Sequence, residues 1–230
     1  MNESLQTQYG FAGAGLAADR QRVLRNTYWL LALSLVPTVL GAWIGVATGL
    51  FATMSPGMST LVFFVGAFGL MFVVEKTKDS AAGVAALLAF TFFMGLMLSR
   101  MVGFVLGFKN GTSLVMTAFG GTAAVFFTMA SFATVIKRDL SSMGKFLLVG
   151  AVILMVAGVA NIFLQSSALM LTMLVMSLAI FSAFMLYDIK RVIDGGETNY
   201  ISATLAIYLD IYNVFQSLLA LLGIFGGDRD

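Results

Sequence analysis

The chain has 230 residues, of which 60% are hydrophobic and 10% are charged, and its formal net charge is +2. No soluble domain of this length could bury so much apolar surface, so the composition indicates an integral membrane protein. Cysteine and histidine are both absent, which excludes disulfides, thiol nucleophiles, zinc sites built from these residues and imidazole proton relays. The small net charge gives no indication of a nucleic-acid partner.

The first 25 residues are polar and rich in Gly, Ala and Gln. They lack the apolar periodicity of a packed helix, so we expect a flexible tail that becomes helical only near residues 16–24. The tail precedes an apolar stretch too long for a cleavable signal peptide. The predicted division of the chain is a tail at 1–25, a transmembrane domain at 26–227 and a short end at 228–230.

Long windows with almost no charged residues define the membrane helices. A helix needs about 20 apolar residues to cross the ~30 Å hydrocarbon core. Two windows, of 49 and 42 residues, are long enough for two spans each, and the other three fit one span each. The windows are 26–74 with a turn near Pro56, 80–99, 110–136, 146–187 with a turn at 161–167, and 198–227. The sequence therefore predicts an all-α bundle of seven transmembrane helices.

Basic residues are distributed unevenly between the two ends of these helices. With the N-terminus in the cytoplasm, ten of the thirteen lysines and arginines fall on the cytoplasmic side. They are Arg20, Arg22, Arg25, Lys76, Lys78, Lys137, Arg138, Lys145, Lys190 and Arg191. Because positive charge favours cytoplasmic loops, we predict a cytoplasmic N-terminus and a C-terminus on the opposite side of the membrane.

Two aspartates, Asp188 and Asp210, lie in strongly apolar surroundings. Residues 146–187 carry no charge, and Asp210 is the only charged residue between positions 198 and 227. An ionised carboxylate in hydrocarbon costs roughly 2.5–3.5 kcal/mol on insertion scales, so it is retained where it has a partner or a water-filled cavity. These two acids are therefore the candidate functional site.

The last predicted span carries a polar stripe. Asp210, Asn213 and Ser217 follow one another at i, i+3 and i+7, which places them on one face of a helix. A polar face within a membrane must contact protein or water, so we expect it to point into the bundle. A buried hydrogen-bond network with a purely structural role is the alternative interpretation.

The two acids differ in predicted depth. Asp188 precedes Lys190 and Arg191 and therefore lies near the inner interface. If the last helix begins near Ile201, Asp210 lies nine residues deeper, or about 14 Å at 1.5 Å per residue. Helix tilt, or continuation of the sixth helix beyond Asp188, would narrow this gap.

Four short stretches carry a family resemblance. They are residues 24–28 (LRNTY), 120–127 (GGTAAVFF), 159–165 (VANIFLQ) and 195–200 (GGETNY). They resemble the Bax inhibitor-1 (transmembrane Bax inhibitor motif) family, and in particular its bacterial YccA-like branch of FtsH-protease modulators. The resemblance covers nearly the whole chain. It implies a bacterial inner-membrane protein, with a periplasmic C-terminus, whose seventh helix is central and surrounded by the other six.

Tyr187-Asp188 and Leu209-Asp210 resemble the acid positions of the family's calcium-leak branch. There, a carboxylate pair on the last two helices forms a pH-sensitive gate, which implies gating positions at Asp188 and Asp210 and a weak site for Ca²⁺. Asn213 extends the same polar stripe. An arginine at the inner end of that branch's second helix latches the pair, and its nearest counterpart here is Lys76, a point charge without the forked geometry of arginine.

Three functions are open on this sequence. The first is modulation of FtsH through the N-terminal tail, with no enzymatic activity and no resident cofactor. The alternative is a pH-sensitive leak for Ca²⁺ or H⁺, because two neighbouring carboxyls titrate as a coupled pair and carboxylate oxygens suit Ca²⁺. An intramembrane aspartyl protease is the third, but Asp210 follows Tyr208-Leu209 instead of the Gly-x-Gly-Asp setting of those enzymes.

Overall fold

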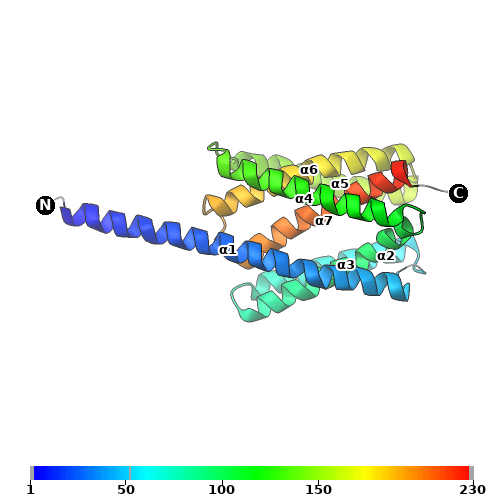
Figure 1. Cartoon of the computed structure of the whole chain (residues 1–230), viewed down its shortest axis with the longest axis horizontal. Coiled ribbons are helices and arrows are strands. Elements are labelled where there is room, and N and C mark those ends of the chain that lie inside the picture. The colour runs from blue at the N-terminus through cyan, green and yellow to red at the C-terminus, as the bar shows by residue number, and fades with distance from the viewer. Residues whose placement is uncertain (1–2, 52, 228–230) are drawn as a thin grey trace.

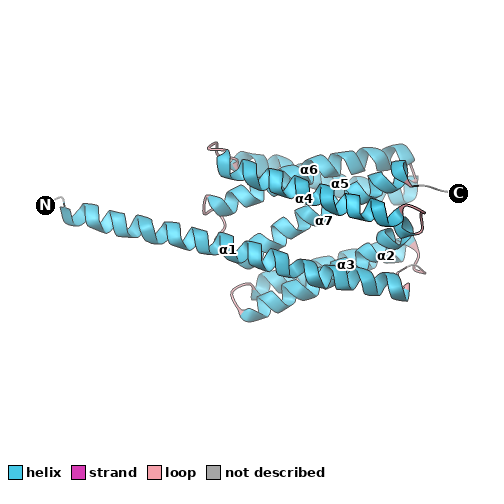
Figure 2. Ribbon diagram, viewed as in Figure 1, coloured by secondary structure: helices cyan, strands magenta, loops and turns pink. Residues whose placement is uncertain are grey.

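The computed structural model describes residues 3–51 and 53–227, with side chains from Ala18 onward. Within these ranges the chain forms seven α-helices and no strand (Figure 2). The helices are α1 (Glu3–Thr48), α2 (Pro56–Thr77), α3 (Ala81–Leu106), α4 (Gly111–Val135), α5 (Ser141–Leu164), α6 (Ser167–Ile193) and α7 (Tyr200–Gly226). Each is long and apolar enough to cross a membrane, so the predicted seven-span fold is confirmed. The predicted short end at 228–230 lies outside the described residues.

Helix α1 is longer than the first membrane span. It begins at Glu3, whereas its membrane-spanning part starts at Ala18. The helical region that we expected only near residues 16–24 therefore extends back to Glu3. Its N-terminal part projects beyond the other helices (Figure 1).

Local sequence explains where several helices begin. Ser55 accepts a hydrogen bond from the backbone N–H of Met58, and Pro56 occupies the first helical position, where its missing N–H costs nothing. Between α5 and α6, Gln165 adopts a left-handed conformation with φ 49°, and the side chain of Ser166 caps the next helix. These turns lie where the sequence predicted breaks at Pro56 and at 161–167.

Helix α7 occupies the centre of the bundle. It packs against α1, α3, α4 and α6 (Figure 1), and a larger share of its membrane window is buried than in any other span. Helix α5, by contrast, packs against α6 at the periphery and buries none of its window. The expectation that the last helix is central is confirmed, but α5 packs on α6, so the other six helices do not all surround α7.

Helices α1 and α3 approach each other closely through small residues. A methyl group at Gly95 would overlap the carbonyl oxygen of Thr38, and one at Gly41 would overlap that of Phe92. Close backbone contact of this kind drives helix association in lipid, where hydrophobicity provides no force between helices. The glycines thus bring α1 and α3 into close contact beside α7.

Replacing Gly95 by alanine tests this packing. The added methyl group forces the backbones of α1 and α3 apart, so we expect a loss of about 1–3 kcal/mol in the free energy of unfolding. The measurement is thermal or denaturant unfolding of the purified chain in detergent. Gly120→Ala is the matched control, because nothing lies within 4 Å of a Cβ at that helical position. Equal stability of the two variants would contradict the packing account.

Candidate functional site

The connection between α6 and α7 is fixed by local hydrogen bonds within the GGETNY stretch. Gly195 has a φ of +80°, which a side chain would disfavour. The carboxylate of Glu197 accepts hydrogen bonds from the backbone N–H groups of Thr198 and Asn199, at 3.0 and 2.9 Å. These contacts hold the chain in position for the first turn of α7.

Asn199 then caps α7 and joins it to the neighbouring connection. Its side-chain oxygen accepts hydrogen bonds from the N–H groups of Ile201 and Ser202, at 2.9 and 3.2 Å. Its amide nitrogen donates to the carbonyl oxygen of Lys78 at 3.1 Å and to the carboxylate of Asp79 at 2.9 Å. The α2–α3 and α6–α7 connections therefore lie together at one end of the bundle.

We call this end, which also includes residues 18–25 and the α4–α5 connection, the basic end. It contains the ten basic residues that the sequence places on one side of the membrane. Outside the spans, the hydrogen bond to Glu75 raises the pKa of Lys78. Hydrogen bonds from the backbone N–H and hydroxyl of Ser141 lower the pKa of Asp139. Both shifts favour the charged form at neutral pH.

One face of α7 forms hydrogen bonds with α1 and α3. The hydroxyl of Tyr208 lies 2.9 Å from that of Thr38 and 3.4 Å from the carbonyl oxygen of Thr91. One helical turn further, the Tyr212 hydroxyl donates to the carbonyl oxygen of Met94 at 3.4 Å. Both tyrosines are buried. Their large side chains thus find polar partners inside the bundle.

The opposite face of α7 contacts α6 through polar groups. The carboxyl groups of Asp188 and Asp210 lie close enough to interact directly, and we call them the carboxyl pair. Asp210 is only 4% exposed, and its Oδ2 atom has no hydrogen-bond partner among the described residues. Ser217 continues this face, with its hydroxyl donating to that of Ser177 at 3.0 Å.

The structure brings the two acids together because α6 is longer than its uncharged window. It continues five residues past Asp188 to Ile193, while α7 begins ten residues before Asp210, at Tyr200. The difference in depth is therefore about 7–8 Å along the helices, roughly half of the 14 Å that the sequence suggested.

Two charged residues that follow Asp188 in the chain act on it. Arg191 and Glu197 both act electrostatically on Asp188, and they form an ion pair at 2.8 Å. Lys190 is buried, with 8% of its surface exposed, and its Nζ lies 2.5 Å from the Oδ1 of Asp194, with which it forms an ion pair. From the sequence, Arg191 was counted only among the basic residues of the cytoplasmic side. Its position three residues after Asp188 on a continuous helix is the signal that would have identified it.

The two other predicted site residues make their described contacts with groups other than the two acids. Lys76 is exposed and its Nζ lies 5.5 Å from the ring centroid of Phe72. Within the described part of the chain, no ion pair joins Lys76 to either acid. Asn213 is half-buried, and its amide donates back to the Leu209 carbonyl of its own helix at 2.8 Å.

The carboxyl pair has limited capacity to bind a metal ion. Among the described residues, no group of three or more acidic side chains is arranged to hold one. A Ca²⁺ ion at this position would receive two carboxyls and would need carbonyl oxygens or water for the rest of its six to eight ligands. The acidic side chains of the described residues thus supply two of these ligands at this position.

The fold and the site together define a multi-pass membrane protein built around a central polar helix. The family model for "Inhibitor of apoptosis-promoting Bax1" matches residues 20–227. A protein of Escherichia coli K12, named "Modulator of FtsH protease YccA", is 38% identical over 207 residues, which cover 90% of this chain and 92% of that protein. The chain therefore belongs to the Bax inhibitor-1 family.

Two further relatives show the same extent of similarity. An uncharacterised protein of Pseudomonas aeruginosa is 38% identical over 226 residues, covering 97% of this chain and all of its own length. An uncharacterised membrane protein of Vibrio cholerae is 38% identical over 210 residues, covering 90% and 91% of the two chains. The similarity to these relatives thus covers nine tenths or more of this chain.

Proposed function

We propose that this chain is a bacterial inner-membrane modulator of the FtsH protease and has no catalytic activity of its own. The observation that carries the proposal is the 38% identity, over 90% of the chain, to a protein named as such a modulator. Of the relatives cited above, one is named as a modulator, one as an uncharacterised membrane protein and one as an uncharacterised protein, and none of the three is named as an enzyme.

The N-terminal tail, residues 1–25, is the proposed point of engagement. A protease that pulls its substrates from the membrane needs a segment that it can reach outside the bilayer. The N-terminal part of α1 projects beyond the bundle at the basic end (Figure 1). The described connections at that end are short: residues 78–80, 136–140 and 194–199. The tail is therefore the most accessible long segment.

The seven-helix body is the proposed source of resistance. Glycines bring α1 and α3 into close contact, and two tyrosines of α7 bond to those helices. Extraction of α1 would have to break these contacts in lipid, where unpaired polar groups are costly. A chain that is engaged easily but unfolds slowly would occupy the protease and reduce its turnover of other substrates.

Deletion of residues 2–20 tests the role of the tail. We expect the truncated chain to lose copurification with FtsH while its membrane bundle remains folded, because the truncation removes the proposed engagement segment. The measurement is copurification from membranes, with thermal unfolding as the check on folding. The control is a chain in which a Gly/Ser segment of equal length replaces residues 2–17. It separates the effect of the length of the tail from the effect of its sequence. If the truncated chain binds FtsH as well as the full chain, contacts between membrane helices are responsible and the tail mechanism fails.

We also propose that the basic end faces the cytoplasm and that the C-terminus is periplasmic. The ten basic residues at this end support that orientation through the positive-inside rule. The same orientation would place the tail on the side where an ATP-driven protease has its energy source.

Cysteine labelling tests the orientation cleanly, because the chain contains no cysteine. Thr198→Cys at the basic end and Thr53→Cys at the opposite end are both exposed positions. We expect a membrane-impermeant thiol reagent to label only the Thr53 variant in intact cells with a permeabilised outer membrane, and to label the Thr198 variant after lysis. The reverse pattern would overturn the proposed topology.

The second candidate function is a pH-sensitive leak for Ca²⁺ or H⁺ through the carboxyl pair. It is favoured by one specific observation, the buried and unpartnered Oδ2 atom of Asp210 beside Asp188. A hydrogen bond between two carboxyl groups needs a proton, because ionised carboxylates only accept. A shared proton would hold α6 against α7, and its loss would place two like charges between the helices.

Asparagine variants of the pair test this second function. Asn cannot ionise, so Asp188→Asn and Asp210→Asn should each keep the helices together and abolish the rise of ion flux with pH. The measurement is Ca²⁺ and H⁺ flux into proteoliposomes between pH 5 and pH 8. Asp139→Asn is the control acid at the same end, where the asparagine side-chain oxygen can still accept the hydrogen bond from the Ser141 backbone N–H. Identical pH profiles for wild type and both pair variants would reduce the pair to a structural role.

A further inference from the structure

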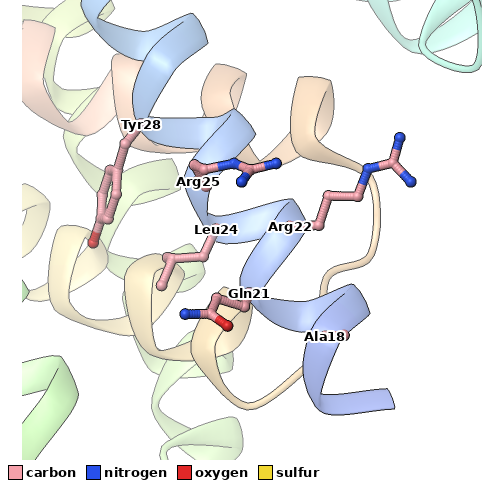
Figure 3. A pocket seen from close by; sticks show the side chains of 6 residues that line it. All are labelled: Ala18, Gln21, Arg22, Leu24, Arg25 and Tyr28. Carbon is pink, nitrogen blue, oxygen red and sulfur yellow. The ribbon is translucent and has the colours of Figure 1, made fainter. Parts of the chain in front are cut away.

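A cavity of about 580 Å³ lies at the basic end, around the turns of α1 that enter the membrane (Figure 3). It is lined by Ala18, Gln21, Arg22, Leu24, Arg25 and Tyr28. Polar and basic groups therefore line the cavity on the same turns as a leucine and a tyrosine ring. This mixture is typical of a site at the boundary between lipid headgroups and acyl chains.

The two arginines of the cavity are exposed and free to bind an anion. Arg22 and Arg25 are three residues apart, which places them on one face of α1, and Figure 3 shows both guanidinium groups extending to the same side. Within the part of the chain that the structure describes, neither forms an ion pair. By contrast, Lys190, Arg191 and Lys78 at the same end are each paired with an acid.

The face that carries these arginines continues into the membrane as an apolar stripe. Its members follow at helical spacing and are all strongly exposed: Trp29, Leu33, Val36, Leu40 and Trp43. In a bilayer such a stripe contacts acyl chains, and tryptophans favour the two interfaces. Trp29 and Trp43 are 14 residues apart, or about 21 Å along the helix. The stripe therefore leads from the hydrocarbon directly to Arg25 and Arg22.

We propose that this cavity binds the headgroup phosphate of an anionic phospholipid from the leaflet at the basic end. The phosphate lies between Arg22 and Arg25, whose guanidinium groups extend to the same side of α1. The acyl chains lie along Trp29 and Leu33. Arginine suits this role because its planar fork matches phosphate oxygens. The continuity of charged cavity and apolar stripe favours a lipid over a free anion, which would use only the charged part.

The bound lipid would act at the point where the tail leaves the bundle. Arg20, one residue from the cavity, packs its side chain against Gly195 in the α6–α7 connection. A lipid held by the next two arginines would fix this part of α1 against the membrane surface. The proposal concerns the membrane anchoring of the tail and is independent of whether FtsH is the partner.

The chain offers two built-in reporters for a test. Its two tryptophans lie at opposite ends of the stripe. A Trp43→Phe chain reports on lipid at Trp29, and a Trp29→Phe chain reports on lipid at Trp43. Each chain is reconstituted into phosphatidylcholine vesicles that contain increasing amounts of brominated phosphatidylglycerol. In a second series, the phosphatidylcholine is brominated and the phosphatidylglycerol is not. The quenching of tryptophan fluorescence in the two series gives the relative binding constant of the two lipids beside each tryptophan.

At Trp29 we expect a preference for phosphatidylglycerol of roughly 30-fold, since each basic residue near the surface contributes about 1 kcal/mol. Arg22→Gln/Arg25→Gln should remove this preference, whereas Lys137→Gln/Arg138→Gln, which removes two exposed charges elsewhere at the basic end, should retain it. Trp43 should show no such preference. A preference that is equal at both tryptophans, or that survives the Arg22/Arg25 change, would overturn the proposal. Loss of the preference in millimolar inorganic phosphate at constant ionic strength would assign the cavity to a free anion and would also overturn it.

Discussion

A polar side chain within the hydrocarbon core needs a partner from the protein, and α7 brings several such side chains to one helix. Its tyrosines bond to α1 and α3, while Asp210 and Ser217 meet Asp188 and Ser177 of α6. These two sets of contacts lie on opposite faces of α7. The central position of the last helix follows, because only a helix enclosed by others can satisfy polar groups on both sides.

The remaining helices pack around this arrangement mainly through small and apolar residues. Helix α1 packs onto α3 through Gly41 and Gly95, so the two partners of the tyrosines form a single unit. Helix α5 is apolar from Phe146 to Ala160 and packs on α6 from outside. The bundle thus has an apolar periphery and a hydrophobic core, into which a small number of buried polar groups are set.

Charge and hydropathy were sufficient to predict the seven spans, because uncharged apolar windows of about 20 residues or more are rare outside membrane helices. The polar stripe also indicated correctly that the last helix faces inward. The depth of Asp188 was harder to predict, since the uncharged window ends before it while α6 continues to Ile193. Basic residues at a helix end extend to the interface, so they do not mark where the helix stops.

The surroundings of the pair could not be derived from residue type alone. Lys76 and Arg191 are both basic residues at the same end, yet only Arg191 acts on Asp188. Asn213 shares the face of Asp210, but its amide bonds to its own backbone. Distinguishing these outcomes requires the relative rotation of α2, α6 and α7.

The central claim is that Asp188 and Asp210 form one interacting unit between α6 and α7. A double-mutant cycle tests it most directly, with the free energy of unfolding in mixed micelles measured for wild type, Asp188→Asn, Asp210→Asn and the double variant. The account predicts that the two single effects do not add and that the coupling energy is on the order of 0.5–3 kcal/mol, as for residues in contact. Additivity within about 0.5 kcal/mol, as found for distant independent sites, would contradict it.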